Sequence, residues 1–323
     1  MKYFIITIDT EGDNLWKHKL GDKISTKNSQ YLPKFQELCN IYNFKPVYLV
    51  NYEMANDPFF VEFGCEIIKK KQAEIGIHLH AWNNPPNYEI YNHYNDYGLP
   101  YLIEYPFSVM LEKFDFLLNL LNKNFNCDII SHRSGRWAMN QNYFDILIQN
   151  GIKIDCSFTP HISWHKSKGY SKNSRGSDYK KCEEEPFIIK NSKLENTIME
   201  IPVTIRKLNN LNIDNFNINT YFSSIKYLLK PKYIWLRPNG KNLQEMLSLV
   251  DFIKNSDSKY LMFMLHSSEL MSSGSPTFKD DESINNLYYH LEILFNAISK
   301  NFKGITLKDF YNSIPITNQS RSK

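Results

Sequence analysis

The 323-residue chain has no apolar run of about 18 residues, the length that a membrane-spanning helix needs. Its five cysteines are odd in number and show no paired spacing, so we expect ordinary thiols of a reducing compartment. The formal charge of +4 is small and dispersed, which argues against a nucleic-acid partner. The first apolar stretch, residues 3–8, is too short for a secretory leader. We therefore expect a cytoplasmic protein without a membrane span.

Strand-like and helix-like apolar patterns alternate along the chain, and no internal repeat is visible. The expected strands cover residues 3–8, 47–50, a segment that ends at His80, 127–133, 152–156, 197–203 and 260–265. The expected helices cover residues 30–43, 58–71, 108–123, 140–150, 221–229, 243–254 and 280–300. Two helix ends are marked by their chemistry, because Asn56-Asp57-Pro58 is a helix start and Gly151 is a helix stop. This alternation predicts parallel strands in an α/β layer or barrel.

No break in composition marks a second domain, so we expect one catalytic domain over residues 1–314. Two long loop insertions are expected at 83–106 and 157–196, because these segments are irregular and rich in polar residues or tyrosine. Residues 315–323 are expected to form a disordered tail.

Two pairs of polar residues carry the clearest chemical signal. His78 and His80 are two apart in an expected strand, so their imidazoles point to the same side. Asp9 and Glu11 are also two apart and follow an apolar run. Each pair alone has an ordinary explanation, as strand histidines or as a turn cap. Together they suggest a metal-dependent hydrolase.

Polar residues also end several other expected strands. Chemistry in parallel α/β folds gathers at the carboxyl ends of the strands, so we expect these side chains to converge. They are Asp9, Glu11, His78, His80, Arg133, Asp155 and His266.

Five stretches carry a family resemblance: Thr-Ile-Asp-Thr-Glu-Gly (7–12), Glu-Ile-Gly-Ile-His-Leu-His-Ala-Trp-Asn-Asn-Pro-Pro (74–86), His-Arg-Ser-Gly-Arg-Trp (132–137), Glu-Ile-Pro-Val-Thr (200–204) and His-Ser-Ser-Glu-Leu-Met-Ser-Ser-Gly-Ser-Pro (266–276). With them the chain resembles the polysaccharide deacetylases, carbohydrate esterase family 4, and within these the WalW-like branch. The resemblance implies a distorted (β/α) barrel of about seven strands. It also implies removal of acetyl groups from N-acetylated sugars with a divalent metal ion, for which Zn²⁺ is the expected choice.

The resemblance also assigns roles to residues of this chain. It makes Asp9 the base, Arg133 the residue that orients this base, and His266 the general acid. Glu11, His78 and His80 become the metal ligands. Asp155 is what remains of a further catalytic motif, and we include it among the catalytic candidates.

The chain departs from the usual family pattern in the spacing of its ligands. Most members have adjacent aspartates in the first motif and histidines four apart in the second, whereas both pairs are two apart here. Asp13 therefore stays open as an alternative to Glu11 for the acidic ligand. Arg136 and Arg237 are either salt-bridge residues or part of a substrate groove. Three tryptophans either line a pocket for an acyl group or sugar or pack in the core: Trp82, Trp137 and Trp164.

The function expected from all of this is hydrolysis of an amide carbon–nitrogen bond. The substrate would be an N-acylated sugar precursor, such as a sugar nucleotide or a lipid-linked glycan, in the synthesis of a surface polysaccharide (O-antigen or capsule). A deformylase or an O-acetyl esterase of the same fold is the nearest alternative. A catalytically silent carbohydrate-binding protein is the alternative from another class. The oligomeric state stays open.

Overall fold

The computed structural model of the chain describes residues 1–17, 23–88, 99–208 and 232–314. The helix expected at 221–229 and the tail expected at 315–323 lie outside these residues, as does the middle of the insertion expected at 83–106. No helix in the described ranges combines the length and the apolar character that crossing a bilayer requires.

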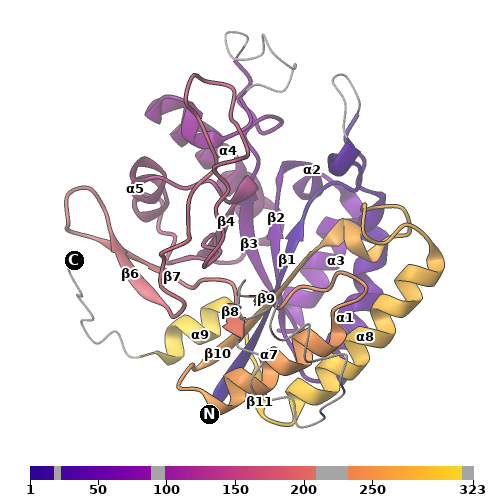
Figure 1. The fold of residues 1–323 in the computed structure, drawn as a ribbon. Helices are drawn as coiled ribbons and strands as arrows, with labels where there is room; N and C mark the ends of the chain where they lie inside the picture. The colour runs from indigo at the N-terminus through magenta and orange to yellow at the C-terminus, as the bar shows by residue number, and fades with distance from the viewer. Residues whose placement is uncertain (18–22, 89–98, 209–231, 315–323) are drawn as a thin grey trace.

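A sheet of nine strands forms the centre of the fold, and seven of its eight parallel strands follow one another in the order β10-β1-β2-β3-β4-β5-β7 (Figure 1). These strands are β1 (Lys2–Thr10), β2 (Pro46–Val50), β3 (Glu74–Leu79), β4 (Ser131–Ser134), β5 (Ile154–Asp155), β7 (Thr197–Glu200) and β10 (Tyr260–His266). Two short strands were not predicted: β6 (Phe187–Lys190) is antiparallel to β7, and β11 (Phe302–Gly304) is parallel to β1. β6 lies inside the loop expected at 157–196.

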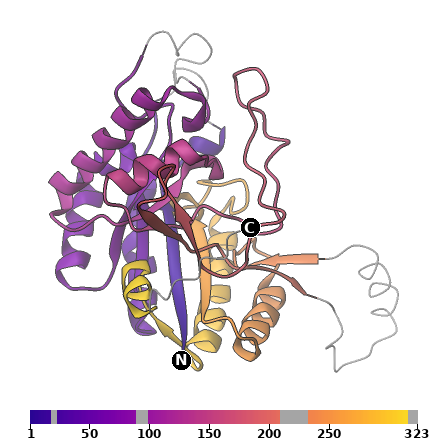
Figure 2. The ribbon, with the colours of Figure 1, turned by 90° about the vertical axis from the view of Figure 1, so that its left-hand side faces the viewer.

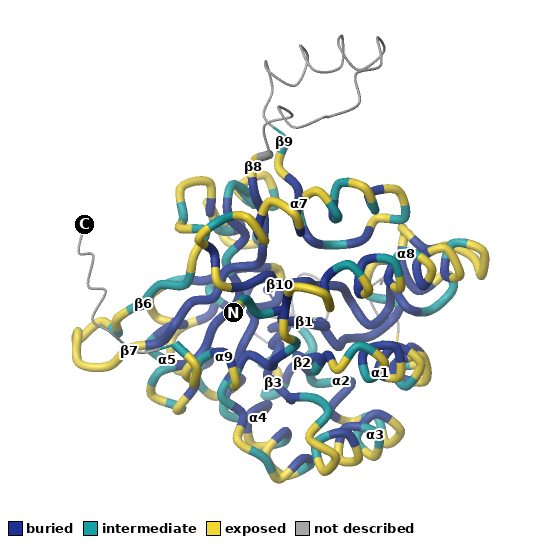
Figure 3. The backbone as a smooth tube through the Cα atoms, turned by 90° about the horizontal axis from the view of Figure 1, so that it is seen from below, coloured by how far each residue is buried: buried dark blue, intermediate teal, exposed yellow. Residues whose placement is uncertain are grey.

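The two faces of the central strands supply two separate hydrophobic clusters. In β1, Phe4 and Ile6 belong to the larger cluster, which contains most of the buried side chains of the helices. Ile5 belongs to the smaller cluster, which we call the inner cluster. In β10, Met262 and Met264 are also inner residues. This alternation follows from the two-residue period of a strand. Figure 3 shows the result, with buried strands in the middle and helices around them that expose their outer sides.

Helices surround the curled sheet (Figures 1 and 3). They are α1 (Leu32–Ile41), α2 (Tyr52–Ala55), α3 (Pro58–Lys69), α4 (Phe107–Phe125), α5 (Gln141–Gln149), α7 (Leu243–Asn255), α8 (Asp281–Ser299) and α9 (Leu307–Ser313). Short 3-10 turns are η1 (Leu15–Lys17), η2 (Lys27–Tyr31), η4 (Leu102–Glu104), η5 (Gly135–Trp137) and η6 (Ser267–Leu270). Both marked helix ends are confirmed: the Asp57 carboxylate accepts from the Phe60 amide at 2.7 Å before α3, and Gly151 follows α5 with φ of +81°.

The barrel is distorted because β7 and β10 do not pair. The segment after β7 bridges the gap, where the Leu236 amide donates to the Thr204 carbonyl at 3.1 Å and the Met264 amide donates to the Leu236 carbonyl at 3.3 Å. Beside this bridge β8 (Ile205–Leu208) and β9 (Lys232–Trp235) form an antiparallel pair that was not predicted. The expected distorted (β/α) barrel of about seven strands is confirmed.

The long segment between β5 and β6 rises from the carboxyl end of the barrel (Figure 2). Two isolated antiparallel bridges, Ser163 with Asp178 and Lys168 with Arg175, fold it back on itself. It thus forms an irregular wall beside the strand ends, where the candidate site lies.

Candidate metal centre

Strand register places the predicted polar residues together. The inner face of β1 carries Ile5 and, at the same parity, Asp9, which pairs in register with His266 of β10. His78 of β3 pairs in register with Arg133 of β4. Because all these strands are parallel, their polar carboxyl ends meet at one end of the barrel, as the sequence predicted.

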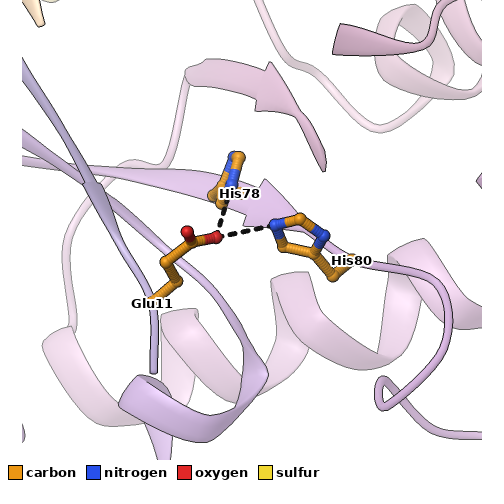
Figure 4. A group of neighbouring side chains, drawn as sticks. All are labelled: Glu11, His78 and His80. Carbon is orange, nitrogen blue, oxygen red and sulfur yellow. Dashed lines mark hydrogen bonds and ion pairs between the residues drawn. The ribbon is translucent and has the colours of Figure 1, made fainter. Parts of the chain in front are cut away.

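Glu11, His78 and His80 form a buried group whose ligand atoms lie within 4.8 Å of one another. The Glu11 Oε2 atom is 2.7 Å from His80 Nε2 and 3.4 Å from His78 Nε2. Figure 4 shows both imidazoles directed at this one carboxylate. Burial opposes the ionisation of Glu11, but the two histidines outweigh it and hold its pKa well below the usual range.

The hydrogen bonds of His78 fit a cation at this point. Its Nδ1 atom lies 2.9 Å from the Arg133 carbonyl, which can only accept, so Nδ1 carries the proton. In the neutral ring Nε2 then presents a lone pair to the Glu11 carboxylate, which is repulsive unless a cation or proton lies between them. Burial lowers the pKa of His78, but the Asp9 and Glu11 carboxylates outweigh it and raise that pKa overall. The donor set therefore suits a metal ion, which two imidazoles and a carboxylate commonly hold.

Packing orients His80, because its Nδ1 atom is buried and has no hydrogen-bond partner among the described residues. The Trp82 ring lies 4.2 Å from the His80 ring, measured between centroids. Gly135 lies close by, and a Cβ atom there would be only 2.8 Å from His80 Nδ1. The burial of this ring lowers the pKa of His80.

Asp9 is held by Arg133 next to the group of ligands. The guanidinium donates to Asp9 Oδ1 at 2.6 Å, to Thr7 Oγ1 at 2.9 Å and to the Cys156 carbonyl at 3.0 Å. Burial raises the pKa of Asp9, but the Arg133 charge outweighs this effect and the pKa lies below its usual value. Asp9 is thus ionised, and its second oxygen has no bond to Arg133.

His266 reaches toward both acidic residues, with Nε2 3.7 Å from Asp9 Oδ2 and 3.7 Å from Glu11 Oε1. Its other nitrogen, Nδ1, lies 3.3 Å from Glu269 Oε2 and 3.0 Å from Arg237 Nη2. The same carboxylate accepts the His266 amide at 2.8 Å. Burial raises the pKa of Glu269, but Arg237 outweighs it and lowers that pKa to about 2.

A cleft of about 410 Å³ opens above these residues. Its walls are unusually aromatic, because four tryptophans and one tyrosine line it: Trp16, Trp82, Trp137, Trp164 and Tyr101. Trp137 and Trp164 stack with ring planes 6° apart. Aromatic faces with a few polar groups among them are typical of small-ligand sites.

The structure does not bring Asp155 or Asp13 into this group. Ile154 belongs to the inner cluster, so its neighbour Asp155 faces the opposite side and accepts from His132 Nδ1 at 2.7 Å. Burial raises the pKa of the neighbouring Glu200 well above its usual range, and the charge of Asp155 raises it further. Asp13 accepts from Ser25 Oγ at 3.2 Å instead.

Sequence reasoning assigned no role to Trp16, and it left Arg237 open. Trp16 follows Glu11 by five residues in the same loop, and its ring meets His266 at 5.0 Å between centroids. Glu269 was also missed, although it follows His266 by three residues within a motif of the resemblance. Trp16 and Arg237 have no periodic or spacing signal, so only their contacts show their relevance, whereas the place of Glu269 within the motif could have indicated it.

No protein-family model matches the sequence, and no curated protein matches it significantly. Solved structures do share its fold. A protein from Mycobacterium smegmatis described as a polysaccharide deacetylase has a TM-score of 0.54 at 10% identity, over 100% of this chain and 95% of that one. A GH57 branching enzyme from Thermococcus kodakaraensis has a TM-score of 0.55 at 10% identity, over 97% of this chain and 71% of that one.

A 4-alpha-glucanotransferase from Thermococcus litoralis has a TM-score of 0.54 at 15% identity. The match covers 97% of this chain but spans only 40% of the glucanotransferase. These likenesses establish the fold.

Proposed function

We propose that this protein is a metal-dependent hydrolase that removes the N-acetyl group from a sugar. The observation that carries the proposal is the buried group of Glu11, His78 and His80, whose ligand atoms lie within 4.8 Å of one another at the base of an aromatic cleft. The Asp9–Arg133 pair and His266 stand beside it. The fold likeness to a protein described as a polysaccharide deacetylase supports the same reading.

Zinc is the ion that we propose, because two imidazoles and one carboxylate are among its usual donors and leave a coordination position open. Glu11, His78 and His80 would hold it. When bound, such an ion polarises an acyl carbonyl and makes a water more acidic.

The proton transfers fall to Asp9 and His266. Asp9 Oδ2, the oxygen that Arg133 leaves free, accepts a proton from the attacking water. His266 Nε2, which points into the cleft, donates a proton to the sugar nitrogen as the amide carbon–nitrogen bond breaks. The products are acetate and the free amino sugar. Each of the two transfers is worth about 10²–10⁴-fold in rate.

A glycoside-cleaving activity is the rival that the glucan-processing neighbours suggest. Such an activity needs two carboxyl groups, one of them protonated. Asp9 and Glu11 are the acidic residues that line the cleft within the described part of the chain, and each is bound by a cation or by imidazoles that lower its pKa. The site therefore favours hydrolysis of an amide.

The narrower proposal concerns the substrate and the setting. From the sequence resemblance to the WalW-like branch, we propose a nucleotide- or lipid-linked precursor of a surface polysaccharide such as O-antigen or capsule, deacetylated in the cytoplasm. A formyl group or an O-acetyl ester is the alternative acyl group, which product analysis distinguishes.

The test combines metal analysis with an assay of acetate release from N-acetylated sugars. We expect about one zinc ion per chain and an activity that a chelator abolishes and zinc restores. Asp9→Asn should keep the metal and lose at least about 100-fold in kcat. Asp251→Asn, at an exposed position of α7, is the matched control.

Three results would change the conclusion. Activity that is indifferent to the chelator and to Asp9→Asn overturns the mechanism. Release of formate, or turnover of O-acetyl esters alone, selects the related hydrolases. A protein that binds zinc and sugar but hydrolyses neither amide nor ester is the silent carbohydrate-binding protein.

A further inference from the structure

Three arginines lie at or directly beneath the cleft, and two of them have carboxylate partners. Arg133 binds Asp9 at 2.6 Å, and Arg237 lies 3.1 Å from Glu269. Arg136 is exposed and lines the cleft, and no described carboxylate lies within ion-pair distance of it. Its guanidinium lies over the Tyr101 ring, 4.8 Å from the centroid. Within the described residues, Arg136 is thus the arginine of the cleft whose charge is not balanced.

The backbone holds Arg136 in this place at some energetic cost. Arg136 and Trp137 have φ angles of +57° and +60°, a left-handed conformation that residues other than glycine rarely adopt. Such strain persists only where the surroundings over-determine it, and it concentrates at functional sites.

The residues on either side supply that restraint. Gly135 packs so closely that a Cβ atom there would lie 2.5 Å from the Leu79 carbonyl. Trp137 is buried, and it packs against the stacked Trp164 ring and the Arg133 guanidinium. The guanidinium carbon lies 5.1 Å from the centroid of the Trp137 ring. Arg136, between these two anchors, remains at the surface of the cleft.

We propose that Arg136 binds an anionic group, a phosphate or a carboxylate, that the substrate carries in addition to its N-acyl sugar. A guanidinium presents a planar fork of donors that matches both groups, and an aromatic ring beneath it keeps the fork in place. The neighbouring tryptophans offer apolar faces for the sugar ring, so the charged group and the ring would be bound side by side. This inference rests on the proposed function for the sugar and deepens it, because it names the residue that recognises the charged part of the substrate.

Binding can be measured by calorimetry without turnover in the zinc-loaded Asp9→Asn protein. The probes are N-acetylglucosamine, N-acetylglucosamine 1-phosphate and N-acetylglucosaminuronic acid. We expect one of the charged sugars to bind roughly tenfold to a hundredfold more tightly than the neutral one, the range typical of a hydrogen bond to a charged group. Which one binds better tells a phosphate substrate from a carboxylate substrate.

Arg136→Gln should reduce this preference to about unity, and Arg136→Lys should restore part of it because it keeps the charge and loses the fork. Arg175→Gln, at an exposed position of the wall between β5 and β6, is the control and should keep the preference. The inference is overturned if the preference survives Arg136→Gln, if it is absent, or if neither charged sugar binds.

A separate assay of acetate release, in the protein with Asp9 intact, distinguishes failure of this inference from failure of the proposed function. Charge-selective binding through Arg136 without any acetate release refutes the hydrolysis and leaves the anion site. Acetate release without charge selectivity refutes the anion site alone.

Discussion

Arg133 Nη1 lies 2.6 Å from Asp9 Oδ1, although 124 residues separate the two in the chain, and both side chains are buried. The pair connects β4 to β1 through the interior of the barrel. The guanidinium also donates to Thr7 of β1 and to the carbonyl of Cys156, the residue that follows β5, so it links β4 to two other parts of the barrel. It therefore supports both the position of Asp9 and the stability of the barrel.

Arg133→Met is expected to lower the free energy of unfolding by about 3–5 kcal/mol, because it leaves the Asp9 carboxylate buried without a partner. Urea denaturation measures this loss. The double variant with Asp9→Asn should recover part of it, since the uncompensated charge is then removed. Arg175→Met, at an exposed position, serves as the control, and a loss below about 1 kcal/mol for Arg133→Met would contradict the prediction.

Gly135→Ala is expected to weaken zinc binding by about tenfold or more, as the loss of support around a metal ligand commonly does. The new methyl group would lie 2.8 Å from His80 Nδ1 and 2.5 Å from the Leu79 carbonyl, so the imidazole must move. Competition with a chelating dye measures the affinity.

Gly151→Ala is the matched control for that experiment. A Cβ atom at Gly151 meets nothing within 4 Å, but the φ of +81° makes alanine unfavourable there. This variant should lose about 1 kcal/mol of stability and keep its zinc affinity. Equal zinc affinities for the two variants would show that the Gly135 contact does not position His80.

Glu269→Gln is expected to lower kcat by roughly tenfold to a hundredfold and to change KM little. The carboxylate holds the His266 ring through Nδ1 and balances the charge of Arg237. Its pKa of about 2 means that it is charged throughout the neutral range, so the substitution removes a full charge. Steady-state kinetics on an N-acetylated sugar measure the change.

Glu282→Gln, at an exposed position in the first turn of α8, is the control for Glu269→Gln and should leave both constants close to those of the wild type. If Glu269→Gln instead raises KM with kcat intact, the residue acts on substrate binding rather than on His266.

Lys113 predicts a pH dependence of stability. Its Nζ atom donates to the carbonyls of Asn84 and Pro86 at 2.6 and 2.9 Å, and burial lowers its pKa from 10.5 to about 8. Between these two values the unfolded chain binds more protons than the folded protein, so this group makes stability rise with pH. Below about pH 8 the folded protein bears the full free-energy cost of burying the Lys113 charge. Loss of the proton at higher pH removes this cost and raises the free energy of unfolding by about 3 kcal/mol.

The measurement compares wild type with Lys113→Met by urea denaturation between pH 8 and 10.5. The stability of the wild type should rise relative to that of the variant across this window, while other titrating groups cancel in the difference. Lys123→Met, at an exposed position of the same helix, should show no such trend. A flat difference for Lys113→Met would contradict a lowered pKa.

Most of the parallel sheet could be predicted from the sequence because its strands are continuous apolar runs that end in polar residues. Asp9 and His266 were found in this way, and the parallel register then places them side by side. β6 and β11 were missed because they are too short to show a period. β6 has only four residues and is partly exposed, and β11 has three residues.

Asp155 shows the limit of the argument from strand ends. It ends β5 just as His266 ends β10, but β5 has only two residues and offers no alternation that tells which of them faces inward. In the structure Ile154 packs in the inner cluster, and the Asp155 carboxylate accepts a hydrogen bond from His132. A shift of one residue in a strand moves a side chain to the opposite face, so proximity to a strand end does not suffice.

The sequence by itself determined the alternation of strands and helices. It also determined that side chains two residues apart in a strand point to the same face, and both features follow from the local period of the backbone. It also brought the polar strand ends to one side of the sheet, since parallel strands share a direction. Only the tertiary structure decided which oxygen faces which nitrogen. The partners of His266 and the unbalanced charge of Arg136 depend on contacts between segments that are distant in the chain, and these contacts are set by side-chain packing rather than by any local pattern.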